Sequence, residues 1–150
     1  MLYIDIHGHS KKRSSFMYGC VSQRNPYRSK EFPYVLYKRM THFSYFSCNF
    51  VMQRSKEGTS RITLFKSGIE NSYAYELSFC GPVRERRHFS IKDYKNIGTE
   101  LGSNIAFYFH SRVLEIEPNP EIQHHCQEFY TDEELMNAGD CETNGSSSEL

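Results

Sequence analysis

The chain has 150 residues, a length that suits one domain with an adequate core. Its 18 Lys and Arg balance 18 Asp and Glu. No apolar run approaches a membrane span and the N-terminus lacks the basic and hydrophobic regions of a signal peptide, so we expect a cytoplasmic protein without a membrane partner. Five cysteines, an odd number without a C-x-x-C pair, argue against a disulfide scaffold.

The charges are distributed unevenly along the chain. Residues 1–114 contain all 18 Lys and Arg and 8 acidic residues, a net +10, whereas residues 115–150 contain the other 10 acidic residues. A basic body indicates an anionic partner or an ordinary solvated surface. The composition of 115–150 is typical of a disordered tail. We therefore predict a domain over 1–114 followed by an acidic tail over 115–150.

The first half of the chain reads as short strands, loops and one helix. An apolar run rich in β-formers predicts a strand over 2–7, after which Gly8 lets the backbone turn sharply. The further expected segments are a polar connection (11–15), a strand (16–20), a loop (21–31), a helix opened by Pro33 (to about 40), an extended segment (46–50) and a loop (55–60).

The second half is expected to contain two strands and a long helix. Residues 61–65 read as a strand before a turn at Ser67 and Gly68, and residues 73–79 as another strand, which Gly81 ends. From Ser90 as N-cap, apolar residues recur at helical spacing, at positions 91, 94, 97, 101, 105, 108 and 109. We expect a mixed α/β sheet with an open edge and a long C-terminal helix.

Two of the predicted strands carry the residues of greatest chemical interest. His7 ends the first strand, where α/β sheets keep ligand and metal sites, and Glu76 lies in the aromatic strand 73–79. Zinc hydrolases use neutral imidazoles as ligands and a carboxylate as base. His7 can equally be a polar boundary residue, and Glu76 a partner in a structural salt bridge. For a shared site, they must lie within about 10 Å of each other.

Several sequence blocks resemble the cytosolic carboxypeptidases, a family of zinc metallocarboxypeptidases, in the same order. The blocks are Ile4–Ser10, Phe16–Cys20, Ser47–Phe50, Ser55–Arg61 and Gly68–Glu76, and residues 90–114 resemble the family's closing helix. The resemblance covers roughly the C-terminal half of a catalytic domain. It implies a partial, mixed-sheet, zinc exopeptidase domain that lacks its N-terminal half.

The resemblance also implies roles for individual residues. His7 matches the third zinc ligand, and Glu76 matches the catalytic carboxylate that serves as base and then as acid. Arg61 matches the position that lines the pocket for the substrate's terminal side chain, where a cation would pair with glutamate. Without the resemblance, Arg61 would be assigned to the surface, because arginine is mostly exposed.

The chain lacks several site residues that the family has before the block matched by His7. The family's His-x-x-Glu ligand pair, and the Asn and Arg that hold the substrate's α-carboxylate, precede the His7 block, so one of three zinc ligands is present. The segment His125–Glu128 has the His-x-x-Glu spacing but lies in the acidic tail, and short motifs often match by chance. One histidine does not make a zinc site, and we expect the chain alone to be inactive.

The resemblance implies a zinc-dependent carboxypeptidase that removes glutamates from acidic protein tails such as those of tubulin, with this chain as a fragment of it. The alternative is a catalytically inactive short form that binds acidic polypeptides. Nucleic-acid binding is disfavoured, because no recognised nucleic-acid motif accompanies the basic charge.

Overall fold

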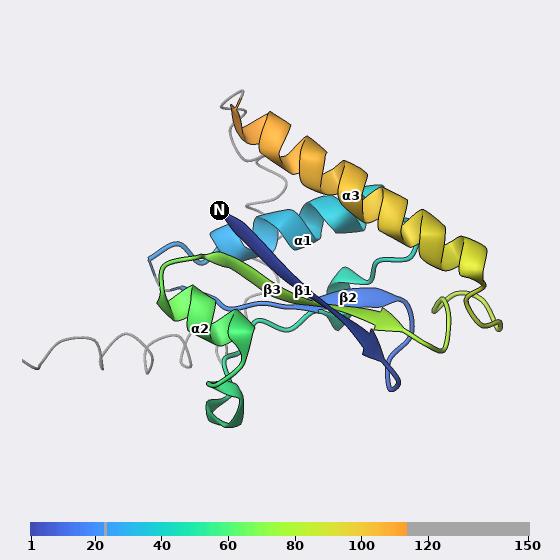
Figure 1. The fold of residues 1–150 in the computed structure, drawn as a ribbon, viewed down its shortest axis with the longest axis horizontal. Helices are drawn as coiled ribbons and strands as arrows, with labels where there is room; N and C mark the ends of the chain where they lie inside the picture. Colours follow the sequence, from blue (N-terminus) through green and yellow to red (C-terminus); the bar gives the residue numbers. More distant parts are fainter. Residues whose placement is uncertain (23, 114–150) are drawn as a thin grey trace, which may run out of the picture.

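The computed structural model describes residues 1–22 and 24–113 (Figure 1). Its elements, in chain order, are β1 (Leu2–His9), β2 (Ser15–Tyr18), α1 (Arg28–Arg39), the 3-10 turns η1 (Tyr45–Ser47) and η2 (Arg54–Lys56), α2 (Ser60–Lys66), β3 (Asn71–Ser78) and α3 (Ile91–Val113). The expected acidic tail over 115–150, including His125–Glu128, lies outside the described residues.

The three strands form one mixed sheet in the order β1-β3-β2. β3 lies in the middle, parallel to β1 and antiparallel to β2. Successive side chains of a strand point to opposite faces, so the sheet has two faces of different character. One face carries large buried side chains, Met17, Tyr73 and Tyr75, which pack with residues of α1 and α3. This sheet and the long final helix confirm the predicted fold class.

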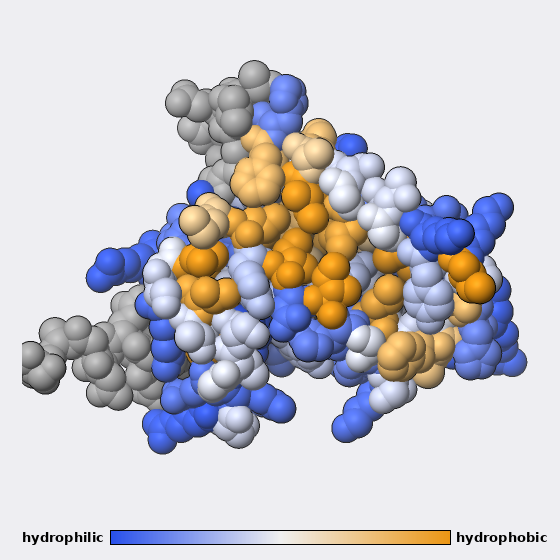
Figure 2. Space-filling view, viewed as in Figure 1, coloured by the Kyte–Doolittle hydropathy of each residue, from blue (hydrophilic) through white to orange (hydrophobic). Residues whose placement is uncertain are grey.

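β1 is an edge strand, as expected from the sequence. In the described part of the chain, only β3 pairs with it. Figure 2 shows apolar side chains gathered in the middle of the view, around β1 and below α3. Ile6 belongs to this strand and is 62% exposed. A free strand edge with exposed apolar side chains is a feature that native proteins usually cover.

Helix α1 begins at Arg28, five residues before the predicted start at Pro33. Proline lacks an amide N–H, so Pro33 cannot donate the helical hydrogen bond to the carbonyl of Ser29. The buried Tyr73 hydroxyl donates to that Ser29 carbonyl instead, at 2.8 Å. A residue of the central strand therefore satisfies the group that the proline leaves unpaired, which allows the helix to extend on the N-terminal side of Pro33.

The predicted strand over 61–65 is wrong, because these residues lie in helix α2. Thr59 has extended backbone angles before the helix, and its carbonyl accepts the amide hydrogen of Thr63. Ile62 is fully buried, and Phe65 packs against the same small cluster. The spacing of three between these two apolar residues is helical, but a window of five residues is too short to distinguish that spacing from strand alternation. The segment expected to be extended at 46–50 likewise begins inside turn η1.

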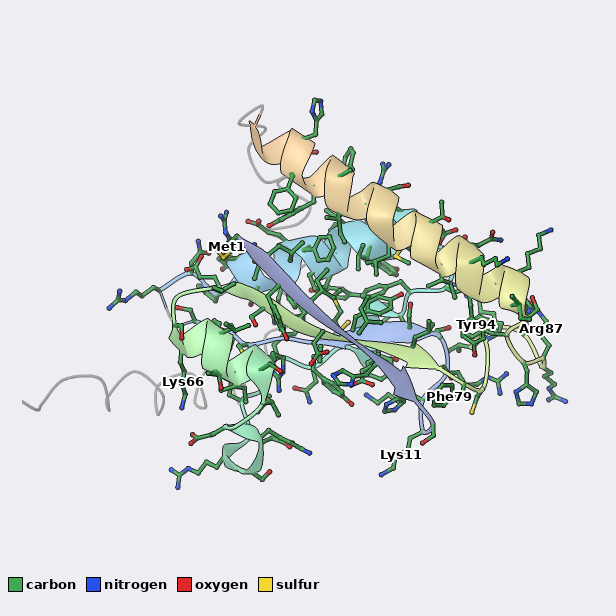
Figure 3. The ribbon with its side chains drawn as sticks, viewed as in Figure 1. Met1, Lys11, Lys66, Phe79, Arg87 and Tyr94 are labelled. Carbon is green, nitrogen blue, oxygen red and sulfur yellow. The ribbon has the colours of Figure 1, made fainter. Side chains whose placement is uncertain are left out.

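Helix α3 begins as predicted, after Ser90. The Ser90 hydroxyl accepts the Asp93 amide at 3.3 Å, and the Asp93 carboxylate accepts the Ser90 amide at 2.7 Å, a reciprocal cap. Arg87 donates to both Asp93 oxygens, at 2.6 and 3.1 Å. Figure 3 shows Arg87 and Tyr94 close to the start of this helix, where the Tyr94 hydroxyl also donates to the Ser78 carbonyl at 3.1 Å. These contacts attach the helix start to the end of β3.

Candidate functional site

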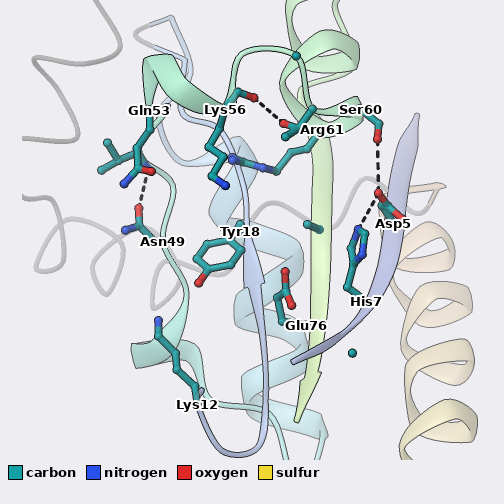
Figure 4. A pocket seen from close by; sticks show the side chains of 15 residues that line it. Asp5, His7, Lys12, Tyr18, Asn49, Gln53, Lys56, Ser60, Arg61 and Glu76 are labelled. Carbon is teal, nitrogen blue, oxygen red and sulfur yellow. Dashed lines mark hydrogen bonds and ion pairs between the residues drawn. The ribbon is translucent and has the colours of Figure 1, made fainter. Parts of the chain in front are cut away.

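A pocket of about 680 Å³ lies on the sheet face opposite α1 and α3 (Figure 4). Its volume is within the usual range for small-molecule and peptide side-chain sites. The lining residues come from all three strands, from the connection between β1 and β2, from the segment between α1 and α2, and from the start of α2. They are Asp5, His7, Gly8, Lys12, Tyr18, Asn49, Val51, Gln53, Lys56, Gly58, Thr59, Ser60, Arg61, Ala74 and Glu76.

His7 and Glu76 are direct partners in the parallel pairing of β1 with β3. Paired residues on neighbouring strands have side chains on the same face, and the strands lie about 4.8 Å apart. Both residues line the pocket, two positions before the end of their strands. The expected proximity of His7 and Glu76 at one end of the sheet is therefore confirmed.

The strand β1 continues through Gly8 to His9, so the sharp turn expected at Gly8 is wrong. A Cβ atom at Gly8 would lie 2.1 Å from Phe79 Cζ, inside the van der Waals contact distance. The glycine therefore lets the exposed Phe79 ring lie against the backbone, and a larger residue would displace that ring. The continued strand places His9 on the same face as His7.

The His7 imidazole is held by a carboxylate from its own strand. Its Nε2 lies 2.8 Å from Asp5 Oδ2, two residues earlier on the same face, and the Ser60 hydroxyl donates to that oxygen at 3.4 Å. A carboxylate on one ring nitrogen fixes the orientation of the imidazole and leaves the other nitrogen available as a ligand. The His7 side chain is 51% exposed, so Nδ1 of the neutral ring can serve as that ligand.

Glu76 forms an ion pair with His9 that the sequence did not reveal. His9 Nδ1 lies 3.2 Å from Glu76 Oε2, and both side chains are mostly buried, at 17% and 13% exposure. The carboxylate only accepts, so Nδ1 carries the proton, while Nε2 of His9 is buried without a hydrogen-bond partner in the described part of the chain. Glu76 thus has the structural salt bridge considered as the alternative, and it also lines the pocket.

Arg61 is buried, at 9% exposure, so the surface position that its residue type alone suggests is wrong, and it lines the pocket. Its guanidinium donates to the Gly19 carbonyl and to Cys20 Sγ, and the Ser72 hydroxyl donates to its backbone carbonyl at 2.9 Å. The N-terminal turn of α2 thereby directs the side chain across the end of β2 and into the pocket wall (Figure 4).

Tyr18 is a pocket residue that sequence reasoning missed. It lies on β2 beside Ala74 of β3, and the period of two along the strand is the signal that would have placed it on the pocket face. Burial, and then the negative charge of Glu76, raise the pKa of Tyr18 above its ordinary value. The phenol is consequently neutral at physiological pH and available as a hydrogen-bond donor.

The described residues do not make a complete metal site. Within 1–22 and 24–113, no three His, Cys, Asp or Glu side chains are grouped so that they could hold an ion. His7 offers one imidazole, whereas a catalytic zinc ion takes three protein ligands. Asp5 and Glu76, the two pocket carboxylates, are already engaged by histidines. Further ligands would have to come from outside the described residues.

Comparison with known proteins identifies relatives of one kind. No family model matches the chain. It is 43% identical to cytosolic carboxypeptidase 2 of Xenopus tropicalis over 115 residues, and 39% identical to cytosolic carboxypeptidase 3 of Bos taurus over 116 residues. Each alignment covers 72% of this chain and 12% of the relative, so the chain spans about an eighth of the curated relatives it matches.

A solved structure with the same fold is a metallo-carboxypeptidase from Burkholderia cenocepacia. Its TM-score is 0.60 at 13% identity, and the match covers 73% of this chain and 30% of that chain. At this identity, the likeness concerns the fold alone. Among the described residues, no helix has the length and apolarity needed to cross a membrane.

Proposed function

Because this chain belongs to the cytosolic carboxypeptidase family and has the fold of a metallo-carboxypeptidase, we propose that it is part of a zinc-dependent carboxypeptidase that removes glutamates from acidic protein tails, such as those of tubulin. His7 is one zinc ligand, Glu76 is the catalytic carboxylate, and Arg61 binds the terminal side chain of the substrate. The observation that carries this proposal is the pairing of His7 with Glu76 in a pocket that also contains Arg61.

Glu76 suits proton transfer because it lies at a pocket wall and its position is held by His9. Its role is to accept a proton from the attacking water and to return that proton to the leaving amine. The contact with His9 Nδ1 uses Oε2 and restrains the carboxylate. A restrained base needs less reorganisation when the substrate is bound.

Arg61 suits the recognition of glutamate because its charge has no counter-ion among the described residues. Its partners, the Gly19 carbonyl and Cys20 Sγ, are neutral acceptors. A buried cation without a paired anion is costly, and a substrate carboxylate would supply the missing charge through a charge-assisted hydrogen bond. An apolar terminal side chain would leave the guanidinium unpaired.

The chain by itself is proposed to be inactive, because the described residues place one candidate ligand, His7, where zinc needs three. The remaining ligands belong to the other parts of a longer protein. The incomplete ligand set, together with an intact cationic pocket, also supports a second candidate function for the isolated chain. In that form it binds acidic polypeptides without cleaving them.

The test is the release of glutamate from a peptide that ends in glutamates. The isolated 150-residue chain should show no turnover, whereas a longer protein that contains it should show turnover that a chelator removes. Glu76→Gln should abolish the activity of the longer protein. Glu57→Gln is the matched control, because Glu57 pairs with Lys66 and does not line the pocket. Full activity of the Glu76 variant, or loss of activity in both variants alike, would contradict the proposal.

A further inference from the structure

A surface with both apolar and basic side chains lies at the end of the molecule where β3 leads into α3. Three large apolar side chains are exposed there, Phe79 at 62%, Val83 at 59% and Ile91 at 76%. Figure 2 shows apolar and strongly hydrophilic side chains next to each other at this end, on the right of the view. This loop surface consists of seven exposed residues that do not line the pocket, Phe79, Val83, Arg84, Arg86, Ile91, Lys92 and Lys95.

Hydrogen bonds from the β1–β2 connection hold the backbone of the loop in place. Arg13 Nε donates to the Pro82 carbonyl at 3.0 Å. Its Nη2 donates to the carbonyls of Glu85 and Arg87, at 3.1 and 2.9 Å. Gly81 has a φ of 116°, and a Cβ atom there would lie 2.2 Å from the Arg87 carbonyl oxygen, so glycine lets the two ends of the loop meet. The exposed side chains are therefore presented from a fixed backbone, which lowers the entropic cost of binding a partner.

The first turn of α3 belongs to the same surface. The Tyr94 hydroxyl donates to the carbonyl of Ser78, the residue before Phe79, at 3.1 Å. Ile91 lies three residues before Tyr94 and four before Lys95, so the three side chains share one side of the helix. Ile91 and Lys95 are both exposed there. Apolar and basic side chains thus lie next to each other on the helix as they do on the loop.

The four cations of the loop surface are left without acidic partners. Within residues 1–22 and 24–113, none of them takes part in an ion pair. The two nearby carboxylates, Glu85 and Asp93, are both bound by Arg87, at 2.5 and 2.6 Å. Between positions 79 and 95, five Lys and Arg and two Asp and Glu leave a net charge of +3. An exposed group of unpaired positive charges favours an anionic partner.

The apolar side chains indicate which anionic partner fits. A nucleic acid or an acidic polypeptide would satisfy the charges but would leave Val83 and Ile91 in water. A lipid bilayer with anionic headgroups offers negative charge at its surface and hydrocarbon just below it. We infer that the loop surface docks on an anionic bilayer, with its apolar side chains inserted below the headgroups and its four cations among them. This contact revises the expectation of no membrane partner, which rested on spanning segments alone.

Tryptophan fluorescence of the 150-residue chain tests the insertion, because the sequence contains no tryptophan. Ile91→Trp places a single tryptophan in the loop surface. Phe109→Trp is the matched control, since Phe109 is 43% exposed on the same helix and lies about 27 Å further along it. With vesicles of phosphatidylcholine and phosphatidylserine, the emission of the Ile91 variant should shift to shorter wavelength, and that of the Phe109 variant should not. With vesicles of phosphatidylcholine alone, neither should shift.

Co-sedimentation with the same anionic vesicles measures the contribution of single side chains. Ile91→Ser should weaken binding about tenfold, because an apolar side chain is lost from the bilayer. Arg84→Gln and Arg86→Gln should each weaken it about fivefold, the usual contribution of one cation near an anionic membrane. Phe109→Ser and Lys66→Gln are the matched controls and should bind as the parent chain does, since Lys66 lies on α2 (Figure 3).

Equal losses in the control and loop-surface variants would overturn the inference, because only overall charge would then be read. Equal binding to neutral and anionic vesicles, or no spectral shift of the Ile91→Trp chain, would also overturn it. So would binding of a single-stranded RNA or an acidic peptide that depends on Arg84 but not on Ile91, without binding to vesicles. Vesicle binding needs neither zinc nor Glu76, so its failure leaves the proposed carboxypeptidase intact, and failure of the hydrolysis test leaves the docking surface intact.

Discussion

Replacement of Arg61 by alanine is the sharpest test of how the pocket recognises glutamate. In a longer, active protein that contains this chain, Arg61→Ala removes the contact to the substrate's terminal carboxylate. A hydrogen bond to a charged group contributes about 1.5–3 kcal/mol, so kcat/KM on glutamate substrates should fall about ten- to a hundredfold. The side chain is only 9% exposed, so solvent screens the interaction weakly and the upper part of this range is expected.

The same substitution has a structural cost that the assay must separate. Arg61 donates to the buried Gly19 carbonyl, and a buried acceptor without its donor costs about 1–3 kcal/mol of stability. A loss of folded protein lowers the rates on all substrates by the same factor. The informative quantity is therefore the ratio of kcat/KM on a peptide ending in glutamate to kcat/KM on a matched peptide ending in an apolar residue.

The ratio should fall at least about tenfold in the Arg61 variant, because an apolar side chain never used the charge. Arg61→Lys keeps the charge without the planar fork and should give an intermediate ratio. Metal content of the variants should be unchanged, since Arg61 is not a ligand. Equal losses on both substrates would show that Arg61 is structural and that the preference for glutamate comes from elsewhere on the basic body.

Three further predictions concern the 150-residue chain itself. Tyr73→Phe should lower the free energy of unfolding by about 1–3 kcal/mol, because the Ser29 carbonyl loses its hydrogen-bond donor. The loss should be smaller in a Pro33→Ala background, where residue 33 has an amide N–H that can donate to the same carbonyl. Equal losses in the two backgrounds, measured by denaturant unfolding, would contradict this. Arg87 and the cap hold the pKa of Asp93 below its ordinary value, so that stability is present above about pH 4 and lost as pH falls further, and Asp93→Asn should flatten the acid side of a Tm–pH profile. A chelator should leave Tm unchanged, because the described residues group no three ligands that could hold zinc. A chelator-induced drop would refute the incomplete site.

The amino-acid sequence alone located the three strands of the sheet and the long helix α3. Runs rich in β-forming residues located β1 and β3, and the serine cap with helical spacing located α3, whose positions 97, 101 and 108 are buried as expected. These features depend on periodicity and on backbone geometry, which are local properties of the chain. The resemblance to the cytosolic carboxypeptidases, and not the periodicity, implied that His7 and Glu76 would meet, and the strand pairing brings them together.

Only the tertiary structure decided the pairings between distant residues. The contact of His9 with Glu76 spans 67 positions and depends on β1 continuing past Gly8 in its pairing with β3. Arg61 is buried because its side chain reaches Gly19 and Cys20, after the end of β2, and its backbone contacts Ser72 of β3, although five residues of sequence read equally as a strand. Helix α1 extends through Pro33 because Tyr73 from another element satisfies a carbonyl. In each case a contact with a residue far away in the chain outweighs the local secondary-structure preference. The residues around the site do not show which distant residue will make that contact.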